Sequence, residues 1–443
     1  MTRTSFFENS VRTVATNICI LFLALAGAVV TARLLGPSGK GLYSLSITFA
    51  GLVLTFTNLG ITASTSYLIA KKAFGLPEVL GNTVFLSLFT SLISVIAGAL
   101  IAFLLPRYIV PGVPPLFLAL ALLAIPFHLT VSNLNNIFLG LNRIKHYNAF
   151  SALRALSDLA FVVLFVYLLR LGVQGALFGH VLSAAVVCSM VFAWTYLSIT
   201  KGISMKPDPA YLRKAINYGF RTHISNILVF LFMRFDLVLV NWFLNPAAVG
   251  LYGTAAAISN QLDLVPYAIG LLLFPKVASQ EDDDRKKILT PRICRSVLLF
   301  TLLGAGAVFA VSEHLVVFLF SQSFYGSVAP LKILVFSVSA LSVWRILSND
   351  IAARGFPEYN IAINLMAVLI NISLNIVLIP SVGIQGAALA SFFSCVTASF
   401  CALGVYCRLS GNKMRKVLLV QPEDLAAYSG SFRMIVKRLS RSC

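Results

Sequence analysis

The sequence has little charge. Only 11% of its 443 residues are Asp, Glu, Lys or Arg, whereas 58% are hydrophobic and the mean hydropathy is +0.90. Soluble globular domains carry about 25% charged residues. This deficit excludes a soluble globular protein and predicts a multi-pass membrane protein.

Paired cysteines and large external loops are also missing. The seven cysteines show no Cys-x-x-Cys or other paired spacing, and most lie in apolar runs, where Cys behaves as a small hydrophobic residue. The longest predicted external connection, 313–327, offers only Glu313 and His314 as ionisable neighbours. The sequence therefore predicts no metal site and no cofactor. It also disfavours a membrane polymerase or glycosyltransferase, which needs catalytic acids on a sizeable outer loop.

Apolar runs long enough to cross a membrane are abundant. A crossing helix needs about 20 apolar residues. Twelve such runs are predicted, at 13–34, 42–69, 79–105, 115–139, 148–169, 174–197, 220–244, 250–275, 294–312, 328–348, 360–380 and 384–408.

The chain contains an internal repeat. With an offset of 209 residues, 12–43 aligns without a gap on 221–252, and ten of the 32 positions are identical. Both copies hold Arg-Thr-x3-Asn-Ile and Pro-x3-Gly-Leu-Tyr, and GVQGA at 172–176 returns as GIQGA at 383–387. The repeat predicts two related halves.

Six helices in each half is an even number, so both halves enter the membrane with the same orientation. The predicted fold is all-α and integral to the membrane, with twelve transmembrane helices as two parallel six-helix repeats around a central cavity. The predicted domains are an N-terminal bundle at 1–200, a cytoplasmic linker at 201–219, a C-terminal bundle at 220–410 and a basic cytoplasmic tail at 411–443.

Positive charge sets the expected orientation. Most of the 34 Lys and Arg residues fall in alternate connections and in the tail, which predicts that both termini are cytoplasmic. This bias accounts for most of the net charge of +19, so no nucleic-acid partner is expected. The tail is read either as short helices on an anionic membrane surface or as a disordered segment.

Ionisable residues inside the predicted spans are candidates for function, because such groups are costly in hydrocarbon. In the second copy of the repeat Arg234 and Asp236 replace Leu25 and Gly27 of the first copy. Their spacing points them to nearly opposite helix faces, so they do not neutralise each other along one face. Asp263 is expected at a similar depth.

The fifth and sixth spans add further ionisable groups. Arg154 and Asp158 are four residues apart, and this spacing allows an ion pair on one helix face. His128 and His180 are each expected as a separate polar contact, with proton coupling as the alternative. Arg345, near the inner end of its span, is expected to extend toward the membrane surface.

Four passages together resemble a known family. They are ARLLGPSGKGLY at 32–43, RFD at 234–236 with NPAAVGLY at 245–252, LFPKVA at 273–278, and GIQGA at 383–387. In this order they look like the polysaccharide transporter branch of the multidrug/oligosaccharidyl-lipid/polysaccharide exporter superfamily, whose members include O-antigen flippases. The resemblance covers about residues 1–410.

The resemblance implies a flippase and not an enzyme. A member of this branch translocates an undecaprenyl-pyrophosphate-linked oligosaccharide across a bacterial cytoplasmic membrane by alternating access. It implies Arg234 as a phosphate-binding residue, with Arg154 and Arg33 as weaker candidates. Asp236 and Asp263 are the candidates for binding a coupling Na⁺ or H⁺, and the implied partners are membrane lipid, a polysaccharide polymerase and glycosyltransferases. A multidrug-type cation antiporter is the alternative in the same class, and a non-transporting scaffold is disfavoured by the charges inside the spans.

Overall fold

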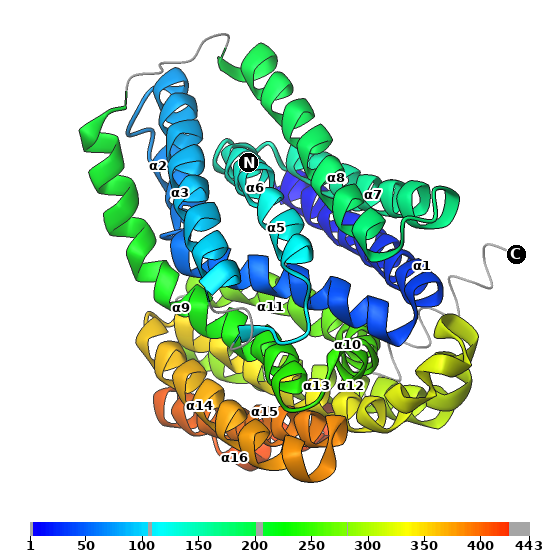
Figure 1. Cartoon of the computed structure of the whole chain (residues 1–443). Helices are drawn as coiled ribbons and strands as arrows, with labels where there is room; N and C mark the ends of the chain where they lie inside the picture. Colours follow the sequence, from blue (N-terminus) through cyan, green and yellow to red (C-terminus); the bar gives the residue numbers. More distant parts are fainter. Residues whose placement is uncertain (1–2, 105–108, 201–206, 281, 425–443) are drawn as a thin grey trace, which may run out of the picture. The chain divides into compact units, whose positions relative to one another are not determined.

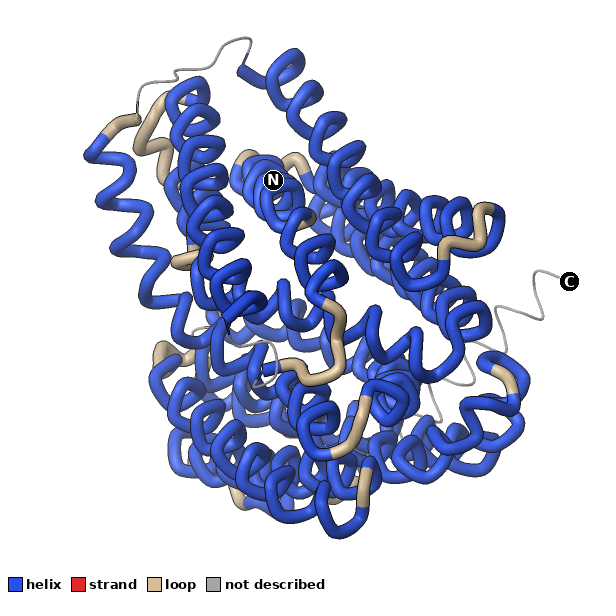
Figure 2. Tube along the Cα trace, in the orientation of Figure 1, coloured by secondary structure: helices blue, strands red, loops and turns tan. Residues whose placement is uncertain are grey.

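Helices make up almost all of the described chain. The structure is a computed structural model that describes residues 3–104, 109–200, 207–280 and 282–424. These ranges hold helices joined by short connections and contain no strand (Figure 2). Eleven of their helices are long and apolar enough to cross a membrane. The prediction of an all-α integral membrane protein is confirmed.

The described chain separates into two compact units. The first comprises Met1–Ile258, Glu313–Pro330 and Ile372–Ala387, and the second comprises Ser259–Ser312, Leu331–Asn371 and Ala388–Cys443. The first unit therefore takes residues from both predicted halves. The division into bundles at 1–200 and 220–410 stays a prediction.

Ten helical segments form most of the first unit. They are α1 (Arg3–Thr57), α2 (Ile61–Ala70), α3 (Leu76–Leu104), α5 (Pro115–Leu123), α6 (Ile125–Gly140), α7 (Ile144–Val162) with its π-helical extension (Val163–Leu168), α8 (Gly172–Thr195), α9 (Pro209–Phe243) and α10 (Pro246–Ser259).

Helix α1 bends sharply between two limbs (Figure 1). Gly36 has φ 67° and ψ 179°, which is not helical, and Pro37 starts the second limb because it needs no N–H partner there. The apolar runs predict an external connection at this point, between the spans 13–34 and 42–69. The helix instead resumes directly after Gly36 and runs to Thr57, so α1 contains the first predicted span and much of the second.

The second predicted span, 42–69, is interrupted. Leu59 and Gly60 have φ of 51° and 71°, so the chain turns before α2 begins. These two features explain why twelve predicted spans correspond to eleven long helices plus the short α2. The apolar pattern of the sequence continues across both breaks, so it does not reveal them. Both breaks are set by the local backbone conformation.

The two copies of the repeat touch at their glycines. A Cβ added to Gly41 would lie 1.7 Å from the Pro246 carbonyl oxygen, and one added to Gly250 would lie 1.9 Å from the Pro37 carbonyl oxygen. Only glycine permits so close a backbone approach. The contact is reciprocal, as expected for segments related by a two-fold axis.

A buried apolar cluster joins α2, α3, α6, α8 and α9. It includes Ile61, Leu80, Leu134, Val187 and Tyr211. On α3, by contrast, four apolar residues spaced four apart along the helix are all exposed: Leu88, Leu92, Ile96 and Leu100. A stripe of exposed leucine and isoleucine at this period is the surface that lipid covers in a membrane helix.

The first unit also holds a π-helical turn (Tyr196–Thr200) and a 3₁₀ turn (Gln322–Ser327). The second unit contains the other helical segments. They are a 3₁₀ turn (Asn260–Asp263), α11 (Leu264–Ala278), α12 (Asp283–Phe320), α13 (Val328–Ala353), α14 (Pro357–Val382), α15 (Ile384–Ser410) and the short α16 (Met414–Leu418). Four of them, α12 to α15, extend into the first unit at one end.

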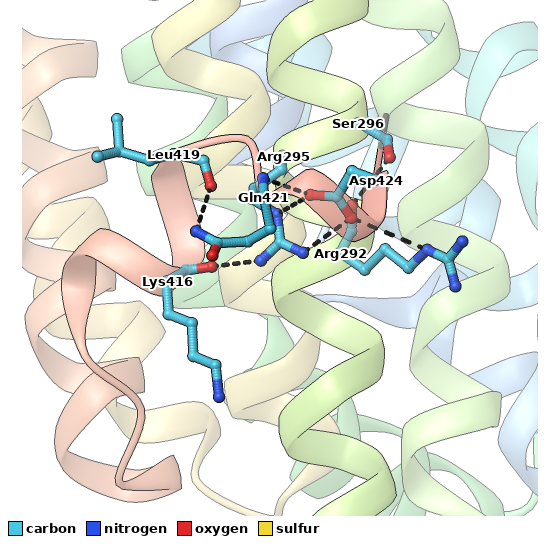
Figure 3. Close-up of polar contacts among 7 residues, drawn as sticks. All are labelled: Arg292, Arg295, Ser296, Lys416, Leu419, Gln421 and Asp424. Atoms are coloured by element: carbon cyan, nitrogen blue, oxygen red, sulfur yellow. Dashed lines mark hydrogen bonds and ion pairs between the residues drawn. The ribbon is translucent and has the colours of Figure 1, made fainter. Parts of the chain in front are cut away.

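The beginning of the tail is fastened to α12 (Figure 3). Arg295 donates from Nε and Nη2 to the two carboxylate oxygens of Asp424, over 2.6 and 2.9 Å, and from Nη1 to the carbonyl oxygen of Lys416. The Asp424 side chain is only 2% exposed. The hydrogen bonds from Arg295 lower the pKa of Asp424 below its usual value. The tail up to Asp424 is therefore ordered; the rest of the predicted tail lies outside the described residues.

Candidate functional site

The first unit contains a cavity between α1, α7 and α8. Its volume is about 350 Å³, and we call it the α7 cavity. Apolar side chains such as Leu23 and Val162 form much of its wall. Its polar lining residues are Thr31, Lys40, Tyr43, Ser151, Arg154, Asp158 and His180.

A second cavity, the α9 cavity, lies between α1, α9 and α10. Its volume is about 370 Å³, and its polar lining residues are Lys40, Tyr43, Ser44, Thr48, Arg234 and Thr254. Ala28, Lys40 and Tyr43 line both cavities. The two cavities are therefore neighbours that share a wall of α1.

Arg154, predicted as a substrate-binding residue, lines the α7 cavity. Within the described chain its guanidinium makes no hydrogen bond and no direct ion pair, although Asp158 lies near enough to act on it electrostatically. The direct bridge that the spacing of Arg154 and Asp158 allows is not formed. The five N–H donors of Arg154 thus remain available to a ligand in the cavity.

Arg234, the leading prediction, lines the α9 cavity. Its side chain is exposed, and among the described residues it has no hydrogen-bond partner and no ion-pair partner. Asp236, two residues away, acts on it only through space. Arg154 and Arg234 therefore occupy different cavities, each with an unengaged guanidinium.

Lys40 connects the two cavities, and the sequence analysis missed it. Its ammonium donates to the Thr31 hydroxyl over 2.6 Å and lies 5.5 Å from the centre of the Tyr43 ring. Lys40 falls in the predicted external connection between the spans 13–34 and 42–69, where Lys is common. A signal was present in the repeat, because the second copy has Val249 at the matching position.

Asp236, predicted to bind a coupling ion, is buried and does not line the α9 cavity. Its carboxylate accepts a hydrogen bond of 2.5 Å from the Tyr252 hydroxyl and one of 2.8 Å from the backbone N–H of Leu237. Tyr252 belongs to the Gly-Leu-Tyr end of the second repeat copy. The carboxylate is thus satisfied by its own unit.

Asp263, the other predicted ion-binding residue, lies in the second unit and is paired. Arg345 donates to its two oxygens over 3.0 and 2.6 Å, in a bidentate arrangement. The Arg345 guanidinium also lies 5.3 Å from the centre of the Tyr267 ring. Arg345 was predicted to extend toward the membrane surface; instead its guanidinium is paired with Asp263.

Arg33, the third predicted substrate-binding residue, lies at the end of a helix. Its guanidinium donates over 2.7 Å to the carbonyl oxygen of Leu319 and also to that of Phe318, in the last turn of α12. The last carbonyl groups of a helix lack partners within the helix, and a cation there is favourable. Arg33 lines neither of the two cavities.

His128 and His180 contact each other, which the expectation of two separate histidines did not foresee. Their Nε2 atoms are 2.7 Å apart, and Nδ1 of His180 is 3.7 Å from a carboxylate oxygen of Asp158. Asp158 and His180 line the α7 cavity. In the part of the chain that the structure describes, no group of three or more His, Cys, Asp or Glu residues is arranged to hold a metal ion.

The comparison with protein families decides the membership of this chain. The model of the polysaccharide biosynthesis protein family matches residues 7–280, which is more than half of the chain. The chain belongs to this family. The resemblance found in the sequence to the polysaccharide transporter branch is thereby confirmed.

Two curated relatives of this polysaccharide biosynthesis protein come from Haloferax volcanii. A probable low-salt glycan biosynthesis flippase, Agl15, is 26% identical over 227 residues, which cover 50% of this chain and 48% of the relative. A probable flippase, AglR, is 25% identical over 276 residues, which cover 60% and 55%. The chain thus spans about half the length of the curated relatives it matches.

Solved structures support the fold of this family member. An inward-facing MATE family multidrug resistance transporter of the MOP superfamily matches with a TM-score of 0.77 at 13% identity, over 91% of this chain and 98% of that one. The lipid II flippase MurJ in an inward closed conformation matches with a TM-score of 0.74 at 15% identity, over 90% and 87%. At these identities the likeness establishes the fold alone.

Proposed function

We propose that this protein is a flippase that carries a polyprenyl-pyrophosphate-linked oligosaccharide across the membrane. The observation that carries this proposal is the set of three cations on the walls of the two neighbouring cavities, Lys40, Arg154 and Arg234. None of the three forms an ion pair with a carboxylate among the described residues. Family membership and the names of the two Haloferax relatives point to the same activity.

The chemistry of the headgroup fits these cavities. A pyrophosphate with its first sugars cannot enter hydrocarbon unaided, because its charges and hydroxyl groups would lose their water. A guanidinium donates two parallel hydrogen bonds to phosphate oxygens, and a lysine ammonium adds a point charge. In our proposal Arg154, Lys40 and Arg234 bind the pyrophosphate in turn or together, while the polyprenyl chain stays in the lipid.

Cavity charge argues against the cation antiporter alternative. A binding site for organic cations would favour acidic walls, whereas the described lining of the two cavities holds three basic residues and a single carboxylate, that of Asp158. Transport, and not an enzyme reaction, is the activity that we propose. A polymerase and glycosyltransferases would then supply and consume the lipid-linked glycan.

Several finer features belong to the same proposal. We place the protein in a bacterial cytoplasmic membrane with both termini inside, from the distribution of its basic residues. The carrier would be undecaprenyl pyrophosphate and the direction outward. Arg33 as a substrate residue, and Asp236 and Asp263 as ion-binding residues, stay predictions; the satisfied partners of all three favour structural roles.

Binding to purified protein tests the proposal. Undecaprenyl pyrophosphate binding is measured by native mass spectrometry for the wild type, Arg154→Gln, Arg234→Gln and the double variant. Each single variant is expected to bind roughly tenfold more weakly, since a charge-assisted hydrogen bond contributes about 1.5–3 kcal/mol. Arg408→Gln, at the end of α15, is the control for loss of positive charge. Equal binding by all variants, or export of cationic dyes by reconstituted protein, would contradict the proposal.

A further inference from the structure

The pair of histidines in the first unit holds one hydrogen bond between two nitrogens. His128 comes from α6 and His180 from α8, and the Nε2 atoms that face each other are 2.7 Å apart. The ring centroids are 4.5 Å apart. A neutral imidazole has one N–H and one bare nitrogen, so one ring donates and the other accepts. A metal ion between them is excluded by distance, because two nitrogens each about 2.0–2.1 Å from one zinc lie more than 3 Å apart.

Asp158 continues this arrangement to the cavity wall. The second nitrogen of His180, Nδ1, lies 3.7 Å from a carboxylate oxygen of Asp158. The Asp158 side chain is 35% exposed and lines the α7 cavity, whereas the His180 side chain is 15% exposed. The order from the cavity inward is therefore Asp158, His180, His128.

The far end of the series is an unused base. Nδ1 of His128 is buried and has no hydrogen-bond partner among the described residues. When His180 directs its Nδ1–H toward Asp158, its Nε2 is bare and accepts from Nε2–H of His128, which leaves Nδ1 of His128 bare as well. The pair can then accept one proton. A second would direct two N–H groups at each other across 2.7 Å, so the capacity is a single proton.

The charged groups around His128 and His180 determine whether the two histidines bind a proton or a sodium ion. Asp158 favours a positive imidazolium, while Arg154 on the same helix and Lys40 on α1 oppose it. Tyr43, also from α1, is the other titratable group on this wall. A sodium ion prefers several oxygen ligands and would meet a guanidinium, an ammonium and two imidazoles. A proton needs only the bare nitrogen that is present.

We propose that Asp158, His180 and His128 form a binding site for one proton on the wall of the α7 cavity. The site exchanges its proton with the cavity through Asp158 in the opposite pair of tautomers, in which Nδ1 of His180 is bare and faces Asp158 while Nδ1 of His128 carries the hydrogen. It rests on the proposed function in one respect: an anionic headgroup beside Arg154 offsets the charge that opposes the imidazolium, so anion and proton bind cooperatively. Linkage makes this coupling reciprocal. H⁺ is then the ion whose binding is linked to that of the anion, and it is held by residues other than Asp236 and Asp263.

Nitrogen NMR tests the proton site without any transport measurement. The five histidines are labelled with ¹⁵N in protein reconstituted in lipid nanodiscs, and spectra are recorded between about pH 5 and about pH 9, the range in which histidine titrates. We expect two histidines to show coupling across a shared N–H···N bond and to take up one proton jointly. His128→Gln and His180→Gln each abolish this signal. Asp158→Asn changes the pH of uptake.

A histidine outside the pair serves as the control. His314→Gln removes an exposed histidine and is expected to leave the shared signal unchanged. Independent titration of His128 and His180, each to a full imidazolium, would overturn the proposal, and so would a pair that binds no proton over this range. Because one variant changes only the carboxylate, a folding defect in a histidine variant does not remove the test.

Calorimetry with inorganic pyrophosphate as the probe tests the link to the anion. Titrations in two buffers of different ionisation enthalpy give the protons taken up on binding, and the difference between wild type and His180→Gln cancels the protonation of the probe. We expect uptake of at most one proton in the wild type and none from the site in His180→Gln. Binding without any such difference would overturn the coupling. Absent binding, with the shared NMR signal intact, would count against the proposed function and leave the proton site standing.

Discussion

The two copies of the repeat use the same backbone plan for different chemistry. In the first copy the helix breaks at Gly36, and in the second α9 ends at Phe243. Beyond that end the Asn245 side chain accepts a hydrogen bond from the N–H of Ala248 at the start of α10. Each copy then begins a new helix at a proline and crosses the other copy at a glycine. The shared positions thus build the crossing.

The positions that differ between the copies build the cavities. Gly27 leaves space in the wall of the α7 cavity, whereas the matching Asp236 fills its place with a carboxylate held by Tyr252. Lys40 brings a cation into the first copy where the second has Val249. Arg234 brings one into the second where the first has Leu25. Both copies therefore supply a cation to a cavity wall.

The glycine crossing is expected to be the most sensitive feature that the copies share. Gly41→Ala or Gly250→Ala would place a Cβ within 2 Å of a backbone oxygen, so the helix starts must separate. We expect each change to destabilise the protein by about 3 kcal/mol or more, measured by thermal unfolding in detergent.

A matched glycine lies in α12. Gly306→Ala meets nothing within 4 Å and is expected to be neutral or slightly stabilising, by up to about 1 kcal/mol. If Gly41→Ala and Gly306→Ala unfold at the same temperature, the crossing does not depend on close backbone contact.

Arg295 in the second unit contrasts with Arg154 and Arg234 in the first, because its guanidinium is fully hydrogen-bonded. Asp424→Asn weakens the bidentate contact, and we expect the tail up to Asp424 to detach with a loss of about 2 kcal/mol. Limited proteolysis after α15 measures the release. Glu423→Gln, next to it and exposed, is the control.

The same contact predicts a dependence on pH. The folded pKa of Asp424 is lowered, so its contribution is fully present above the unfolded value of about 3.9 and is lost as the pH falls through the lower folded value. Tail release in the wild type is therefore expected only below about pH 4. Release near neutral pH would show that Arg295 and Asp424 do not hold the tail.

The two tyrosines that end the repeat copies are expected to respond differently. Tyr252→Phe removes the hydroxyl that donates to buried Asp236, and the unmatched carboxylate oxygen costs about 1.5 kcal/mol or more. Tyr43→Phe removes a hydroxyl with no hydrogen bond in the described chain, and we expect a smaller loss. Unfolding midpoints of the two variants test this. Equal losses would mean that Tyr43 and Tyr252 have equivalent roles.

Lys40 is expected to give the smallest effect, confined to ligand binding. Lys40→Gln should weaken binding of undecaprenyl pyrophosphate by about tenfold or less, because one cation of three is removed while Arg154 and Arg234 remain. Native mass spectrometry measures it. Lys332→Gln, which lines neither cavity, should bind as the wild type does. If Lys40→Gln and Lys332→Gln bind the ligand equally well, Lys40 does not contribute to ligand binding.

The fold was predictable from the sequence, and two of the residues named from it, Arg154 and Arg234, line cavities, while their substrate-binding role stays a prediction. Apolar runs of membrane length and the repeat gave the helical membrane fold, and the presence of Arg234 in only one copy pointed to a residue that the structure places on a cavity wall. Lys40 was not predicted as a cavity residue, because a lysine between Gly39 and Gly41 and close to Pro37 is typical of a loop. His128 and His180 are 52 residues apart, and no pattern links them.

Composition and the apolar runs alone determined that this chain crosses a membrane with helices, since hydrocarbon imposes its length and polarity on every crossing segment. The duplication that the repeat predicts stays a prediction. Only the tertiary structure decided which charged side chains are paired within the protein. Asp263 and Asp424 pair with arginines, and Arg33 binds the end of α12. Arg154 and Arg234 have no hydrogen-bond or ion-pair partner among the residues that the structure describes. A side chain's partner depends on packing between helices, and the sequence records that only indirectly.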